Sequence, residues 1–338
     1  MATMVAPSRH VPMERAIALA RERYGLAADA IRLTGERDEN LKLTVADGTQ
    51  YVLKIANPAE SAAVTDLQTA ALLHLERTDA ALPLPRILRA RAGEVAVRFA
   101  QSPGIERTAR VLSYLPGRLL ADSRRSAAQR AACGRLGGRM SRALGGFDHP
   151  AAARAVIWDV RHVGHLARLL EQMPGFPLRA SAVRLLARLI PQVDARLPRM
   201  RQQVVHGDLN PRNLLVDPDD ESRVVGVIDF GDLTRTALIA DVGVAGAELI
   251  PPDCTDPLRA RECVLEVVRG YHEYVPLLQP ELAILTTLVA ARLLMNVVVH
   301  EWHVHHNPAG GHHAPLSSDH MHAQLELADR LLGEEITL

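Results

Sequence analysis

The chain has 338 residues, of which 48% are hydrophobic and 23% are charged, and its 39 basic residues balance 39 acidic ones. This length predicts two lobes, and the composition is that of a globular protein in water. The charge balance argues against nucleic acid as the main ligand, because binding to a phosphate backbone leaves a basic footprint.

The first part of the chain predicts strands around two helices. Residues 13–24 have the spacing of a short amphipathic helix, and a short apolar strand at 31–33 is followed by a polar turn. Apolar residues alternate in LKLTV (41–45) and YVLKI (51–55), and the turn residues ADGT lie between these runs, so they predict a β-hairpin. Residues 60–75 return to helical spacing.

Further strands are expected at 86–90, 94–99 and 110–115, and the last of them ends at Pro116-Gly117, a strong break. The rest is expected to be helical except for a compact region between Val204 and Ile228. This order predicts an α+β, bilobal fold. A small β-rich, nucleotide-binding N-lobe would span residues 1–115, and a mainly helical, catalytic and substrate-binding C-lobe would span 116–338.

One late segment, residues 282–299, is apolar and long enough to cross a bilayer. It contains Arg292 and Asn296, and a central arginine is costly in hydrocarbon. We therefore expect a buried helix of the larger lobe and no membrane contact. Three cysteines without metal-ligand spacing, and no apolar stretch of signal-peptide length at the start, predict a reducing, cytoplasmic location.

The chemistry concentrates in the segment VVHGDLNPRNLLVDPDDESRVVGVIDFGD, residues 204–232. Asn213 follows Asp208 by five residues and enters a short apolar run, and a second run ends at Asp229. A hairpin of these two runs would bring the amide oxygen of Asn213 and the carboxylate of Asp229 together. Hard oxygen ligands suit Mg²⁺, and a carboxylate such as Asp208 can orient an attacking hydroxyl and accept its proton.

Lys54 stands inside the apolar alternation of YVLKI, where a lysine faces either a cleft or solvent. A lysine that faces a cleft would neutralise nucleotide phosphates. By itself this pattern is weak, since a lysine in a strand is more often a solvated edge residue.

The strand lysine, the break at 116–117, HGDLNPRN and IDFGD occur in the order found in the aminoglycoside-phosphotransferase family, a branch of the protein-kinase-like fold, which this chain resembles over most of its length. The resemblance implies that Asp208 is the catalytic base and that Asn213 and Asp229 bind Mg²⁺. It further implies nucleotide contacts of ATP or GTP with Lys54 through the phosphates and with the backbone of Ser113, Tyr114 and Leu115 through the base.

Longer segments such as LTGERDENLKL, LSYLPGRLL, FDHPAAARAVIWDV and LVAARLLMNVVVHEW are closer to the hydroxylysine-kinase branch. The implied acceptor is the hydroxyl of a small amino-alcohol or hydroxy-amino acid. Aminoglycoside, homoserine and choline or ethanolamine kinases remain alternatives, as does a pseudokinase that binds nucleotide without turnover. A protein kinase is disfavoured because no A-P-E segment follows Asp229.

The family pairs its strand lysine with a glutamate on the following helix, and the corresponding place here holds Gln68, with Asp66 and Glu60 as other candidates. Its glycine-rich phosphate turn is reduced to the single Gly35. These departures leave the partner of Lys54 open, as well as the nucleotide, the acceptor and the oligomeric state.

Other polar residues have structural explanations beside functional ones. His206 is expected to brace the catalytic loop, with Asp232 and Asp241 in a similar role, and Asp159 either binds a substrate ammonium or caps a helix. The histidine-rich stretch at 300–322 misses the H-E-x-x-H register, because Val304 stands where the second histidine would be. We expect no functional metal there.

Overall fold

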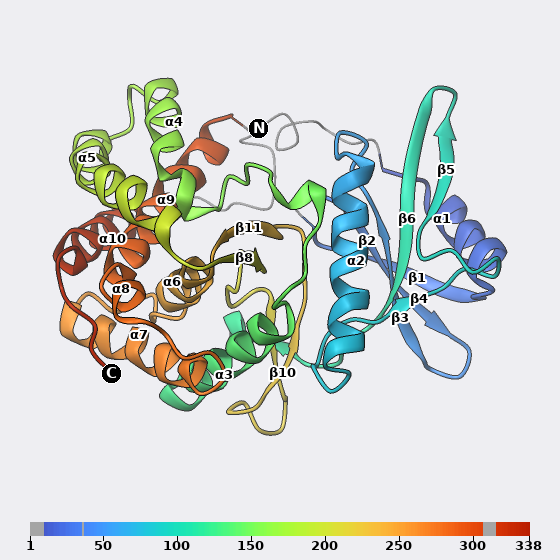
Figure 1. The fold of residues 1–338 in the computed structure, drawn as a ribbon. Coiled ribbons are helices and arrows are strands. Elements are labelled where there is room, and N and C mark those ends of the chain that lie inside the picture. The colour runs from blue at the N-terminus through green and yellow to red at the C-terminus, as the bar shows by residue number, and fades with distance from the viewer. Residues whose placement is uncertain (1–9, 36, 307–315) are drawn as a thin grey trace. The chain divides into compact units, whose positions relative to one another are not determined.

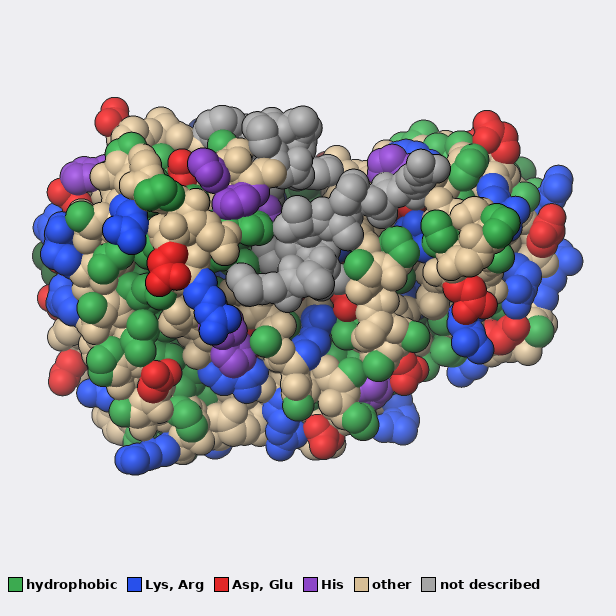
Figure 2. All heavy atoms as spheres, turned by 90° about the horizontal axis from the view of Figure 1, so that it is seen from above, with side chains coloured by type: hydrophobic (Ala, Val, Ile, Leu, Met, Phe, Trp, Pro, Cys, Tyr) green, Lys and Arg blue, Asp and Glu red, His purple; other side chains and the backbone are tan. Residues whose placement is uncertain are grey.

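The computed structural model describes residues 10–35, 37–306 and 316–338. The chain divides into two compact units, residues 1–116 and 117–338. The boundary expected from sequence lies between residues 115 and 116, next to this division, and the roles assigned to the two parts stay predictions. On the face shown in Figure 2, Lys and Arg side chains are intermixed with Asp and Glu side chains.

The smaller unit is built on an antiparallel sheet with the order β1-β2-β3-β6-β4, in which β5 also pairs with β6. The predicted hairpin is present: Leu41 lies opposite Leu53, and the turn contains Gly48 with φ +86°. The strands are β1 (Ala28–Leu33), β2 (Glu39–Val45), β3 (Gln50–Ile55), β4 (Ile87–Leu88), β5 (Val97–Ser102) and β6 (Ile105–Ser113).

The two faces of this sheet have different partners. One face presents Leu41, Leu53 and Val111, which form a core with residues of α1 (Met13–Leu19) and of the π-helical turn Ala20–Tyr24. Because side chains alternate along a strand, Lys54 lies on the opposite face. That face is covered by α2 (Ala62–Thr78), whose first turn is capped by the side chain of Ser61 (Figure 1).

The later strands of this unit differ from the prediction. The expected strand at 94–99 is found at 97–102, and the one expected at 110–115 begins at residue 105 and ends at 113. The turn between them contains Gly104 with φ +81°. Most residues of this hairpin are polar, so the apolar pattern identified only its buried end. The remaining residues are in strands because β5 pairs with β6.

The larger unit is mainly helical and contains two small antiparallel sheets, β10-β9-β7 and β11-β8. Its strands are β7 (Arg118–Leu119), β8 (Gln202–Val205), β9 (Leu214–Val216), β10 (Val224–Val227) and β11 (Thr234–Ala237). Its helices are α3 (Ala127–Ala143), α4 (Leu166–Gln172), α5 (Arg179–Arg196), α6 (Leu238–Glu248), α7 (Pro257–His272), α8 (Gln279–Leu282), α9 (Leu285–His306) and α10 (Ser318–Leu331). Short 3₁₀ turns occupy Leu120–Asp122, Pro150–Ala152, Val160–His165 and Leu197–Arg199.

Helix α9 forms the centre of this unit. Its most apolar window is long enough to cross a membrane, but 89% of that window is buried inside the protein. This confirms the expected buried helix. Residues 307–315 of the histidine-rich stretch lie outside the described residues.

Candidate active site

The segment 204–232 folds as a loop and a hairpin that follow β8. Strands β9 and β10 pair with Leu214 opposite Val227, which confirms the expected hairpin. Its open end is closed by a hydrogen bond from the amide of Ile228 to the carbonyl of Asn213 at 2.9 Å. The residue that enters the first strand thus lies beside the residue that precedes Asp229, as the pattern of the two apolar runs implies.

The carboxylate of Asp208 is largely buried, with 15% of its side chain exposed. Oδ2 accepts from the side-chain amides of Asn210 at 2.7 Å and Asn213 at 2.8 Å, and Oδ1 accepts from Arg292 at 2.6 Å. An ionised carboxylate has about four lone-pair positions. Three donors therefore leave one position, on Oδ1, for a hydroxyl group.

The side chain of Asn213 is fixed by its nitrogen. Nδ2 donates to the backbone carbonyl of Asp208 at 2.9 Å as well as to its carboxylate. Since both contacts use the nitrogen, the amide oxygen is directed away from Asp208, as a metal ligand requires. The sequence had singled out Asn213 for its spacing and for the family motif, but not for these contacts with Asp208.

Asp229 is exposed and has a φ of +58°, in the left-handed region that aspartate tolerates better than most residues. Its Oδ1 accepts from the amide of Gly231 at 3.0 Å. A carboxylate and an amide oxygen form a hard donor pair that fits Mg²⁺, which takes only one or two protein ligands. Within the described residues there is no cluster of three or more His, Cys, Asp or Glu arranged to hold a metal, including the described histidines after residue 300.

The loop that carries Asp208 is held in place by hydrogen bonds to the side chains of His206 and Asp241. Nδ1 of the fully buried His206 accepts from the amide of Asp208, and its Nε2 donates to the carbonyl of Ile228, both at 3.3 Å. Gly207 has φ +81°, and its amide donates to the carboxylate of Asp241 at 2.8 Å. Burial raises the pKa of Asp241, although His206 and the Gly207 amide act in the opposite direction. These contacts support the expected bracing role of His206 and Asp241.

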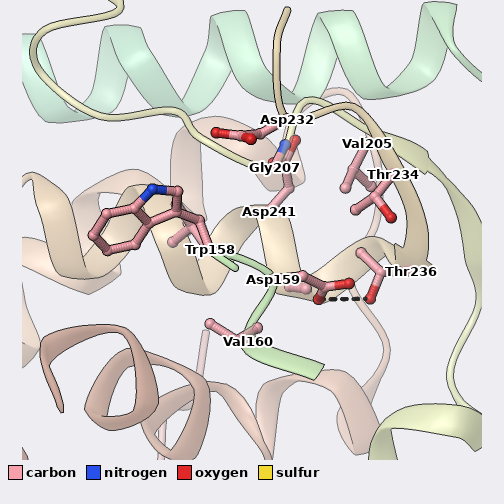
Figure 3. A pocket seen from close by; sticks show the side chains of 11 residues that line it. Trp158, Asp159, Val160, Val205, Gly207, Asp232, Thr234, Thr236 and Asp241 are labelled. Atoms are coloured by element: carbon pink, nitrogen blue, oxygen red, sulfur yellow. Dashed lines mark hydrogen bonds between the residues drawn. The ribbon is translucent and has the colours of Figure 1, made fainter. Parts of the chain in front are cut away.

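Beside this loop is a cavity barely large enough for one water molecule, lined by Trp158, Asp159 and Asp241 among others (Figure 3). Asp159 is 4% exposed, accepts from the amide of Arg161 at 2.9 Å, and accepts from the hydroxyl of Thr236 at 3.3 Å. It thus caps the 3₁₀ helix that starts at Val160. Of its two expected roles, the capping role is the one that the geometry supports.

In the smaller unit, Lys54 pairs with Asp38 of the β1–β2 connection, Nζ to Oδ2 at 3.4 Å, and each side chain is 12% exposed. Sequence reasoning had not weighed Asp38. The residue opposite Lys54 on β6 is Arg110, which donates to the side-chain oxygen of Gln68 at 2.6 Å. The amide oxygen of Gln68 thus lies against Arg110, and direct contact of Gln68 with Lys54 or with a nucleotide stays a prediction.

The segment Ser113–Leu115 is tied to the sheet. The amide of Ser113 donates to the carbonyl of Arg86 at 2.8 Å, and that of Tyr114 to Gln50 at 3.2 Å. The ring of Tyr114 also lies under the ammonium of Lys42, 4.2 Å from its centroid.

Arg292 and Glu248 were missed by sequence reasoning as site residues. Arg292 lies 84 residues from Asp208 in the chain and also donates to Glu248 at 2.7 Å. A signal was present, because an arginine inside a buried apolar helix requires carboxylates around it. The sequence argument used that arginine only against a membrane span.

Comparison with known proteins identifies the family of this chain. A sequence profile of the phosphotransferase enzyme family, APH, matches residues 30–277. Hydroxylysine kinase from Danio rerio is 26% identical over 312 residues, which cover 87% of this chain and 85% of that protein. The mouse enzyme, from Mus musculus, is 25% identical, with 84% and 80% covered.

Among known structures, amicoumacin kinase hAmiN in complex with AMP-PNP, Ca²⁺ and Ami has a TM-score of 0.70 at 16% identity, with 94% of this chain and 93% of that chain covered. A microcompartment-associated aminopropanol kinase has a TM-score of 0.69 at 20% identity, with 94% and 95% covered. These structures share the α+β, kinase-like fold. The profile match spans most of the chain and confirms the predicted family: the protein belongs to the aminoglycoside-phosphotransferase family of enzymes, which transfer phosphoryl groups to hydroxyls of small molecules.

Proposed function

We propose that the protein transfers the γ-phosphoryl group of ATP or GTP to the hydroxyl of a small amino-alcohol or hydroxy-amino acid, as a hydroxylysine-kinase-like enzyme. The similarity to hydroxylysine kinases over more than four-fifths of the chain supports the acceptor class. The observation that carries the proposal is the carboxylate of Asp208, held by three donors with one lone-pair position left for an acceptor.

In this proposal Asp208 orients the acceptor hydroxyl and takes its proton as the bond to phosphorus forms. The new bond joins the acceptor oxygen to the γ-phosphorus, the bond from that phosphorus to the bridging oxygen breaks, and nucleoside diphosphate leaves. Because three donors fix the carboxylate of Asp208, we infer that this residue contributes mainly by aligning the acceptor hydroxyl.

Asn213 and Asp229 would hold Mg²⁺, which neutralises charge on the phosphates when it is bound. Lys54 would contact the nucleotide phosphates. Their negative charge is larger than that of the Asp38 carboxylate, so the phosphates would draw the lysine partly away from Asp38. The amides of Ser113 and Tyr114 are already used within the sheet, so we propose the amide of Leu115 and neighbouring carbonyls as the contacts of the base. Three free cysteines are consistent with a cytoplasmic enzyme.

The experiment is nucleoside-diphosphate release by purified protein with Mg²⁺ and ATP or GTP, over an acceptor panel. The panel holds 5-hydroxylysine, 1-amino-2-propanol, homoserine, ethanolamine, choline and kanamycin. We expect release with an amino-alcohol or hydroxy-amino acid, and mass spectrometry of the phosphorylated product names the acceptor. Release with kanamycin alone would reassign the acceptor class, and nucleotide binding without release on any acceptor would favour a pseudokinase.

A further inference from the structure

Arg292 is a buried cation at the catalytic loop. It lies within α9, and 3% of its side chain is exposed. Each part of its guanidinium has a partner: Nε donates to Glu248 at 2.7 Å, one terminal nitrogen to the carbonyl of Trp158 at 3.3 Å, and the other to Asp208 at 2.6 Å. The indole ring of Trp158 also lies against it, with the centroid 4.7 Å from the guanidinium carbon.

These contacts keep the arginine charged. Burial by itself lowers the pKa of Arg292, but the carboxylates of Glu248 and Asp208 outweigh burial and raise this pKa above its usual value. A permanent positive charge therefore lies against Asp208. Glu248 supplies a second carboxylate, so one guanidinium is shared between two acidic groups.

The three donors to Asp208 come from different parts of the fold. Asn210 and Asn213 belong to the same loop as Asp208, and both donate to Oδ2. Arg292 binds Oδ1 from the core helix α9 and is in turn fixed by Trp158 and Glu248. The orientation of the carboxylate relative to the body of this unit thus depends on Arg292.

We propose that Arg292 is a positioning residue for phosphoryl transfer: it fixes Oδ1 of Asp208 so that the remaining lone pair of this oxygen faces the acceptor hydroxyl, and Glu248 is the counter-ion that holds Arg292 in place. The inference rests on the proposed function of Asp208. It adds that the acceptor hydroxyl and Arg292 share one carboxylate oxygen.

A double substitution separates positioning from folding. Arg292→Met removes the cation and leaves two carboxylates close together in a partly buried place, so it should destabilise the protein. Arg292→Met combined with Glu248→Gln removes the surplus charge and should recover much of the melting temperature. The double substitution cannot restore the orientation of Asp208. In this variant the melting temperature should therefore recover while kcat stays low. Arg259→Met, at an exposed arginine of α7, is the matched control.

We expect the double variant to lose about 10²-fold in kcat, the cost of a displaced catalytic group, with little change in the KM for nucleotide. Arg292→Lys should recover part of the loss, because it keeps the charge without the planar fork. A double variant that is stable and retains wild-type kcat would overturn the proposal.

Basal nucleotide hydrolysis, measured without acceptor in the same assay, separates this inference from the choice of acceptor. If no acceptor is phosphorylated but hydrolysis falls in both Asp208→Asn and the double variant, the acceptor class is wrong and the positioning role stands. Hydrolysis that falls in Asp208→Asn but not in the double variant contradicts the positioning role. If the wild-type protein neither phosphorylates an acceptor nor hydrolyses nucleotide, both proposals are contradicted.

Discussion

Asp229 combines an unusual backbone conformation with a proposed metal ligand. Its φ of +58° places it in a region that asparagine tolerates as well as aspartate does. Asp229→Asn therefore tests the charge without backbone strain. We expect the half-saturating Mg²⁺ concentration for turnover to rise by about tenfold or more, as for loss of a metal-site contact, with little change in melting temperature.

The matched control for this prediction is Asp219→Asn, in the exposed turn between β9 and β10. Activity titrated with Mg²⁺ at saturating nucleotide gives both half-saturation values. An unchanged Mg²⁺ requirement in Asp229→Asn would remove Asp229 from the metal site.

Motif residues that are close in the chain were accessible from sequence, because a loop and a hairpin fix their neighbours locally. Asp208, Asn213 and Asp229 were found in this way, and the hairpin that relates the last two is present. Arg292 was not found as a partner of Asp208, since packing of α9 against the loop brings it from 84 residues away. The contact of Gln68 with Arg110 was missed for the same reason, because it depends on how α2 packs on the sheet.

At the scale of elements, α3 and α7 pack so closely that only glycine fits between them. A Cβ at Gly138 would lie 2.6 Å from the carbonyl oxygen of Tyr271. A Cβ at Gly270 would lie even closer to the carbonyl oxygen of Ala131. The obstructing atoms are backbone, which cannot rotate away as a side chain can. The helices must therefore separate if either glycine gains a side chain.

Gly270→Ala should lower the free energy of unfolding by about 1–3 kcal/mol, the usual cost of overpacking, despite the better helix propensity of alanine. Gly175→Ala is the control, because its Cβ would meet nothing within 4 Å and the residue is exposed. Urea unfolding followed by circular dichroism measures both. Equal stability of the two variants would contradict the close packing of α3 and α7.

Elements with strong apolar periodicity were predicted well, and polar ones were not. The β2–β3 hairpin and the buried α9 follow from their patterns. Strands β7, β8 and β11 have two to four residues each and owe their structure to pairing with neighbours, which a local pattern does not contain.

At the scale of the whole molecule, the three cysteines differ in their exposure to solvent. Cys133 and Cys263 are buried in the helical unit, and Cys254 is partly accessible. Burial raises the pKa of Cys133 to about 12, so almost no thiolate is present at pH 8. We expect Cys254 alone to react quickly with a maleimide in the native protein, and all three to react in denaturant. Rapid native labelling of Cys133 or Cys263, located by peptide mass spectrometry, would contradict this packing.

The most direct test of the central claim is the rate of nucleoside-diphosphate release by wild type and Asp208→Asn, with Mg²⁺, ATP and 5-hydroxylysine or the best acceptor of the panel. The account predicts acceptor-dependent release by wild type and a loss of about 10²–10⁴-fold in kcat in the variant, with nucleotide binding retained. Turnover by Asp208→Asn equal to that of wild type would contradict the assignment of Asp208 as the residue that aligns the acceptor.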